Sequence, residues 1–166
     1  MKNCKSFNAS ADKNSKVLVL GSMPGVKSLE EAQYYAHPQN RFWRVMGKIC
    51  SEPDLYKFSY SDKLKTLLKN HIALWDTIGT CLREGSLDSE IKNEKPNDIR
   101  KLLKKYPEIR AIFLNGNKSY SAFKKYFPDL SKKYECFKMP STSPANARYS
   151  LDLLIREWEI VEKYLK

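Results

Sequence analysis

The sequence predicts an α/β fold: a single three-layer α/β/α domain around a central four-stranded, mostly parallel sheet. Short apolar runs, each typical of a buried strand, alternate along the chain with segments whose apolar residues recur at helical spacing. Strands that alternate with helices pair in parallel through right-handed crossovers. The length of 166 residues suits one such domain.

The expected strands are three mainly apolar runs, at residues 16–20, 72–75 and 109–114, and a fourth segment at 134–139. Each is followed by a polar or glycine-containing segment: Gly21–Gly25, Asp76, Asn115-Gly116 and Pro140–Asn146. Ligands of open α/β sheets bind beyond the carboxyl ends of the strands. We therefore expect these segments to form one site at one edge of the sheet.

Helices are expected between and after these strands. A helical turn is expected within residues 28–34, and longer helices begin near Asn40, Ser61, Asn97, Gly116 and Ser150. Asn and Ser are favoured caps of helix N-termini, so Asn40, Ser61 and Ser150 are candidate caps. The polar residues 1–15 are expected to be a loose N-terminal segment, which leaves 16–166 as the domain, and the irregular residues 79–95 are its longest expected loop.

The charge balance favours a polyanionic partner. The chain has 30 Lys and Arg against 19 Asp and Glu, a formal net charge of +11. Nucleic acid is the simplest polyanion for such a protein, although a generally lysine-rich proteome produces the same excess. No apolar run approaches the roughly 20 residues of a membrane span, and the N-terminus lacks the apolar stretch of a signal peptide. We therefore expect a cytoplasmic protein with no membrane partner.

The cysteines and histidines do not have the spacing of a metal site. The four cysteines form no CxxC pair, and the two histidines add no convincing ligand set. Free thiols, no metal and no cofactor are the expectation.

Three segments have residue types suited to ligand binding. GSMPG (21–25) forms a turn with exposed N–H groups but lacks the Gly-Lys-Ser/Thr ending of a P-loop. YYAHPQNRFW (34–43) combines aromatic rings with an amide and a cation, which suits stacking on a flat ligand or, alternatively, simple core packing with a helix cap. PSTSPANAR (140–148) suits contact with a nucleic-acid backbone or is an ordinary loop before a helix.

Together these segments resemble a known family. GSMPG, YYAHPQNRFW, LWD, FLNG and PSTSPANA, in this order, look like the motifs of the uracil-DNA glycosylase superfamily, over about residues 16–165. Residues 36–43 resemble the mismatch-specific uracil glycosylases. GSMPG, GSLD (Gly85–Asp88) and PSTSPANA together most resemble the DNA-deoxyinosine (hypoxanthine-DNA) glycosylase branch.

The resemblance implies a monofunctional DNA glycosylase of base excision repair. Such an enzyme flips a deaminated base out of DNA and hydrolyses its N-glycosidic bond, leaving an abasic site. Hypoxanthine is the favoured base, with uracil or xanthine possible. The alternatives are a mismatch-specific uracil-DNA glycosylase and an inactive glycosylase fold that binds nucleic acid as an adaptor. A monomer is expected, because one lesion needs one pocket.

The resemblance also implies catalytic roles. Asn40 matches an amide that positions the attacking water, and its alternative role is a helix cap. The backbone N–H groups of Ser22 and Met23, with Ser141, are implied donors to the departing base. Met23 stands where relatives usually have Asp or Asn, which argues against uracil-type chemistry at this position. Met139 stands where many relatives have His, so a slower enzyme is expected.

Further residues match binding positions. Tyr35 matches the aromatic that stacks on the flipped base. Asp76 lies where relatives read the base edge, and it can accept from N1–H of hypoxanthine or N3–H of uracil, or else cap the following turn. Gly25 replaces a bulky Tyr of strict uracil enzymes, which implies a roomier pocket. Expected DNA contacts are Ser143, Asn146 and Arg148 in the loop that fills the gap left by the base, and Asn115 after the third strand.

Overall fold

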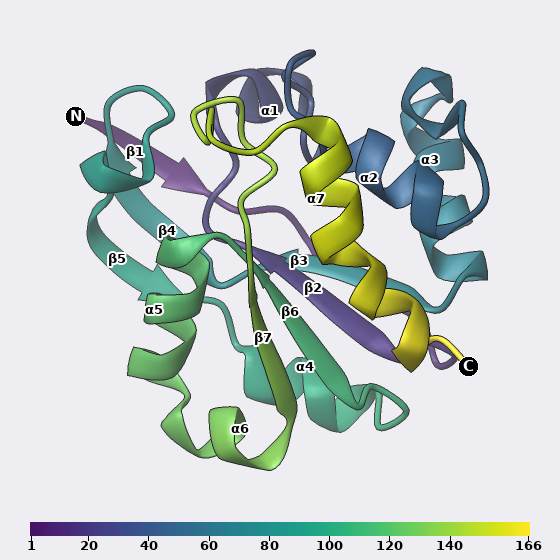
Figure 1. The fold of residues 1–166 in the computed structure, drawn as a ribbon. Helices are drawn as coiled ribbons and strands as arrows, with labels where there is room; N and C mark the ends of the chain where they lie inside the picture. Colours follow the sequence, from purple (N-terminus) through teal and green to yellow (C-terminus); the bar gives the residue numbers. More distant parts are fainter.

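The computed structural model describes residues 1–166 and contains a four-stranded parallel sheet (Figure 1). Its strands are β2 (Val17–Gly21), β3 (Ile72–Asp76), β6 (Ala111–Asn115) and β7 (Glu135–Met139), in the order β3-β2-β6-β7. All neighbouring pairs are parallel. The predicted α/β class and the four predicted strands are therefore confirmed.

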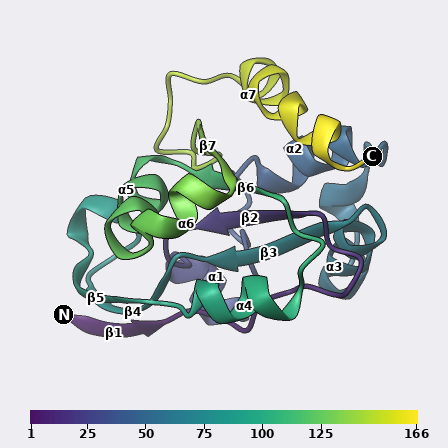
Figure 2. The same ribbon diagram turned by 90° about the horizontal axis from the view of Figure 1, so that it is seen from below.

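Helices cover both faces of this sheet, which gives the three predicted layers. The helices are α1 (Val26–Glu31), α2 (Phe42–Ile49), α3 (Tyr60–Lys69), α4 (Ile99–Lys105), α5 (Asn117–Tyr126), α6 (Pro128–Lys133) and α7 (Leu151–Trp158). Val17 and Val19 of β2 face a core formed with α2, α3 and α7, whereas Leu18 and Leu20 face a second core formed with α4, α5 and α6. Figure 2 shows α7 and α4 on opposite sides of the sheet. Strands buried on both faces appear in a sequence as continuous apolar runs, which is why β2, β3 and β6 were predictable. The edge strand β7, which reads ECFKM, is only partly buried.

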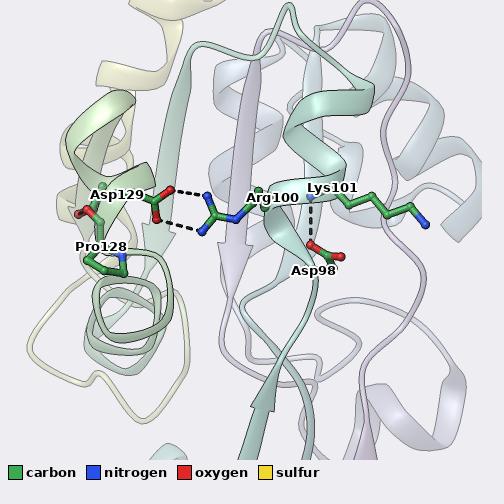
Figure 3. A network of polar contacts seen from close by, with 6 residues as sticks. Asp98, Arg100, Lys101, Pro128 and Asp129 are labelled. Atoms are coloured by element: carbon green, nitrogen blue, oxygen red, sulfur yellow. Dashed lines mark hydrogen bonds and ion pairs between the residues drawn. The ribbon is translucent and has the colours of Figure 1, made fainter.

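Three of the predicted helix starts need correction. Helix α3 is capped by Ser59, not Ser61, and the Asp98 side chain caps α4 by accepting from the Lys101 N–H at 3.1 Å (Figure 3). In the same figure, the neighbouring Arg100 pairs with Asp129 and so joins α4 to α6. The cap residue of α2 is Arg41, although Asn40 also bonds to this helix, as described below. Ser150 caps α7 as predicted.

A second, antiparallel sheet contradicts two further expectations. Strands β1 (Lys2–Lys5), β4 (Ile78–Arg83) and β5 (Lys92–Pro96) form it in the order β1-β4-β5. The expectation that residues 1–15 are loose is therefore wrong for Lys2–Lys5. Within the expected loop 79–95, residues 79–83 and 92–95 are strand, whereas the residues between them are irregular apart from a short 3-10 helix. These strands form because β1 and β5 pair with β4, which is distant from β1 in the sequence. The lysines and asparagines of β1 and β5 have only a weak propensity for β structure.

The two sheets meet at the carboxyl ends of β2 and β3. A single residue, the buried Thr77, separates β3 from β4. The Thr77 N–H donates to the Gly21 carbonyl at 2.8 Å, and the Ile78 N–H donates to the Ser22 carbonyl at 3.1 Å. Asn97 Nδ2 donates to the carbonyl oxygens of Asp76 and Ile78, at 2.8 and 3.3 Å. We call these contacts of Thr77, Ile78 and Asn97 the seam between the two sheets. The seam fixes the segment after β2 against the start of β4.

The structure has no helix with the length and apolar character needed to cross a bilayer. All four cysteines are free thiols. No group of three or more His, Cys, Asp or Glu side chains is placed to hold a metal ion.

Candidate active site

A cleft of about 970 Å³ opens at the carboxyl ends of the parallel strands. Its volume is at the upper end of what small-molecule sites offer. Loops 21–25, 84–90 and 140–149 contribute to its walls, together with residues that precede α2. The structure brings all the predicted site residues to this cleft: Ser22, Met23, Tyr35, Asn40, Asp76, Asn115, Ser141, Ser143, Asn146 and Arg148.

Hydrogen bonds fix the orientation of three polar side chains in the cleft. The Thr142 N–H donates to Asn115 Oδ1 at 3.1 Å, so the Asn115 amide must present its nitrogen on the other side. Asn115 Nδ2 donates to Thr142 Oγ1 at 3.1 Å. The Thr142 hydroxyl, which thus accepts from Asn115, donates its own proton to Asn40 Oδ1 at 2.9 Å. We call this the Asn115–Thr142–Asn40 chain. Thr142 is fully buried and was not among the predicted site residues.

The Asn115–Thr142–Asn40 chain of hydrogen bonds determines which polar atom of the Asn40 amide is available to a ligand. Asn40 Oδ1 also accepts from the Phe42 N–H at 2.9 Å, so both of its lone pairs are used. Asn40 Nδ2 donates to no protein group and is not buried. The oxygen of Asn40 therefore supports the start of α2, as the capping alternative predicted, while its nitrogen remains available to a ligand in the cleft.

Tyr35 and Asp76 approach each other across Gly21. An added Cβ at Gly21 would lie 2.6 Å from Asp76 Oδ1 and 2.8 Å from Tyr35 Oη, so only glycine fits. The Tyr35 ring stacks on Phe42 with centroids 3.9 Å apart, and its hydroxyl accepts from Asn115 Nδ2 at 3.2 Å. One face of the ring is therefore covered, and the opposite face alone is left for a base.

Asp76 is almost fully buried, with 3% of its surface exposed. This burial raises the pKa of its carboxyl to about 7, and the nearby charge of Asp88 adds to the effect. The Ser6 hydroxyl, which donates to Asp76 Oδ2 at 2.9 Å, and the charge of Arg83 oppose it. Near neutral pH the carboxyl is therefore present in both forms and can accept or donate a hydrogen bond.

The GSLD segment brings a second carboxylate to the cleft. The Ser22 hydroxyl donates to Asp88 Oδ1 at 2.6 Å, and the Val26 N–H donates to Ser86 Oγ at 2.8 Å. An added Cβ at Gly25 would lie 3.1 Å from Ser86 Oγ. The missing side chain at Gly25 thus makes room for Ser86, in addition to any room that it leaves for a base. Asp88 received no predicted role, although the GSLD motif was a signal for it.

Arg41 organises the loop between β7 and α7, which lies above the strand ends in Figure 1. Its guanidinium donates to four backbone carbonyls, those of Thr142, Ser143, Asn146 and Tyr149. Burial of the guanidinium lowers its pKa. The sequence showed a cation here but not this role, because the contact depends on a loop about 100 residues away.

The residues of this loop that were predicted to contact the base, Ser141, or the DNA, Ser143, Asn146 and Arg148, differ in their availability. Asn146 Nδ2 donates to the Ser141 carbonyl at 3.0 Å, so this nitrogen is used within the loop. The hydroxyl oxygens of Ser141 and Ser143 accept from the N–H groups two residues later, at 3.1 and 3.2 Å. Arg148 is exposed. Their contacts with DNA remain predictions.

A parallel α/β sheet with a polar cleft beyond its strand ends, lined by these motifs, is the architecture of a base-excising glycosylase. The family model of the uracil DNA glycosylase superfamily matches residues 7–164, and the chain belongs to this superfamily. Particular relatives are similar over nearly the whole length. A hypoxanthine DNA glycosylase of Methanosarcina acetivorans is 40% identical over 161 residues, which are 96% of this chain and 98% of the relative. Another, from Methanosarcina barkeri, is 39% identical over 145 residues, which are 87% of this chain and 89% of the relative.

A solved structure is also similar. A candidate uracil DNA glycosylase from Methanosarcina acetivorans, determined by solution NMR, superposes with a TM-score of 0.84. It is 40% identical in sequence, and the match covers 99% of each chain. The observed fold is therefore the one that the resemblance implied.

Proposed function

We propose that this protein is a DNA glycosylase that releases hypoxanthine from deoxyinosine in DNA and leaves an abasic site. One observation carries the proposal: the free amide nitrogen of Asn40 and the buried carboxyl of Asp76 belong to residues that line the same cleft. The similarity to two hypoxanthine DNA glycosylases supports the choice of base. The net charge of +11 suits a DNA substrate, and we propose that the protein acts as a monomer.

The cleft groups match the edge of a hypoxanthine base. Hypoxanthine presents a carbonyl oxygen beside an N1–H group. With its pKa near 7, Asp76 accepts from N1–H when ionised and donates to the carbonyl when protonated. The free face of Tyr35 stacks on the flipped base.

Backbone donors are available for the charge that develops on the departing base. The N–H groups of Ser22 and Met23 donate to no acceptor within the protein, and both residues line the cleft. Preorganised donors of this kind stabilise negative charge in the transition state. Asn40 Nδ2 donates to the water oxygen and so orients the water toward the sugar carbon.

The test uses labelled duplexes that contain one deoxyinosine, deoxyuridine or deoxyxanthosine, followed by alkaline cleavage of abasic sites. Wild type is compared with Asn40→Ala and with Asn70→Ala, which also removes an amide but lies outside the cleft, at the end of α3. We expect cleavage at deoxyinosine that Asn40→Ala loses and Asn70→Ala retains, with DNA affinity close to normal in both variants.

Other outcomes would contradict the proposal. Cleavage at deoxyuridine alone would identify a mismatch-type uracil enzyme. Binding of duplexes without release of any base would identify an adaptor.

A further inference from the structure

Hydrolysis of a glycosidic bond needs an acceptor for the proton of the attacking water. This inference rests on the proposed function. Asn40 does not provide the acceptor, because Phe42 and Thr142 occupy both lone pairs of its Oδ1. Met23 offers only a thioether, which is a weak acceptor. His37 accepts the Gln39 N–H through Nδ1, so its other ring nitrogen carries a proton when the ring is neutral.

Three carboxyl groups line the cleft, on Asp76, Asp88 and Glu157. Asp76 is buried, and one of its oxygens accepts from Ser6. Glu157 lies on α7, adjacent to Trp158, whose indole N–H is bonded to the Pro140 carbonyl at the base of the 140–149 loop. Asp88 alone is bonded to the loop that follows β2, where Ser22 and Met23 offer their free N–H groups.

Two hydrogen bonds tie the segment of Asp88 to the residues that follow β2. The Ser22 hydroxyl donates to Oδ1 at 2.6 Å, and Ser86, two residues before Asp88, accepts the Val26 N–H at 2.8 Å. Asp88 Oδ2 accepts from no protein group, and Asp88 is an exposed residue that lines the cleft. Asp88 lines the same cleft as Asp76 and Tyr35, the groups expected to hold the base, and its charge raises the pKa of both.

We propose that Asp88 is a catalytic residue whose carboxylate accepts the proton of the attacking water. In this step the water oxygen bonds to C1′ of the sugar, and the C1′–N9 bond breaks with its electron pair leaving on the base. The water proton passes to Asp88 Oδ2 and then to solvent, and the released base takes up one proton from solvent. The same negative charge stabilises the positive charge that develops on the sugar ring.

The proposal predicts opposite effects on chemistry and on DNA binding. A carboxylate in the cleft repels DNA phosphates, so Asp88→Asn should bind a deoxyinosine duplex as tightly as wild type or more tightly. Its single-turnover rate of base release should fall by about 100-fold or more, the usual range for loss of a general base. A purely structural role would instead weaken binding and lower the melting temperature together.

A matched control and a chemical rescue complete the experiment. Glu90→Gln makes the same change of charge in the same short 3-10 helix, Asp88–Glu90, but Glu90 does not line the cleft, so wild-type rates are expected. Asp88→Ala should regain part of its rate when formate is added, because formate supplies a small carboxylate to the vacated position.

Two results would overturn the proposal alone: wild-type rates of base release in Asp88→Asn, or a slow and destabilised variant that formate does not rescue. Absence of base release by the wild-type protein would overturn the proposed function as well, so the two failures are distinguishable.

Discussion

Replacement of Thr142 by valine tests the hydrogen-bond chain that orients Asn40. Valine has nearly the shape of threonine but lacks the hydroxyl, so the bonds from Asn115 and to Asn40 are both lost. Each partner keeps another bond, Asn115 to Tyr35 and Asn40 to the Phe42 N–H. At about 1 kcal/mol for each net hydrogen bond, we expect the free energy of unfolding to fall by about 2 kcal/mol.

The same substitution should slow base release through the orientation of Asn40. With one bond instead of two, the amide can turn away from the geometry that a water needs. If the lost bond contributed about 1.4 kcal/mol of preorganisation, the rate would fall by about tenfold. Single-turnover release of hypoxanthine from a deoxyinosine duplex measures this effect, and thermal unfolding measures the stability change.

Thr142→Ser is the matched control, because serine keeps the hydroxyl and both bonds. It should release base at close to the wild-type rate despite the loss of a buried methyl group. Equal rates for the valine variant and wild type, or a serine variant as slow as the valine variant, would show that the Thr142 hydroxyl does not orient Asn40.

Three further predictions concern other parts of the cleft. The folded-state pKa of Asp76 is raised from 3.8 to about 7, so the contribution of this carboxyl to stability is fully present below pH 4 and is lost as the pH rises to about 7. Asp76→Asn should remove this contribution, and the difference in melting temperature between wild type and variant should change over this pH range. Gly21→Ala places a Cβ 2.6 Å from Asp76 Oδ1, and overpacking should cost roughly 1–3 kcal/mol of stability and most of the activity, as melting and base-release assays would show. Arg41→Lys cannot reach four carbonyls at once, so hydrogen exchange in residues 141–149 should accelerate while the rest of the chain is unchanged.

The larger sheet was predictable because its central strands, β2 and β6, are buried on both faces. Val17–Leu20 and Ile112–Leu114 are continuous apolar runs whose exposure is near zero. The smaller sheet was not predictable by the same rule. Strand β5 reads KNEKP and is largely exposed, and β1 buries one residue of four, Cys4. Such strands exist because they pair with β4, and pairing between distant segments leaves little trace in local composition.

The candidate site likewise contains residues that could be predicted from the sequence and residues that could not. Residues that follow strand ends, such as Asp76 and Asn115, were expected to lie together because parallel strands end at one edge. The residues that orient them were missed. Thr142 and Arg41 act through bonds between loops about 100 residues apart, and Asp88 reaches Ser22 across 66 residues. No periodicity or spacing indicates such contacts.

The seam between the two sheets lies between the groups that surround Asp76 and the two cores that hold the helices of the large sheet. Ser6, Arg83 and Asp88, which surround Asp76 by contact or charge, all belong to the small sheet or to the segments that flank its strands. The large sheet, by contrast, carries the cores that hold the helices. Substitutions in the small sheet can therefore retune the pKa of the Asp76 carboxyl without entering those cores. A laboratory selection for activity on a different damaged base should accumulate its productive changes there, on a scaffold whose foldability is preserved.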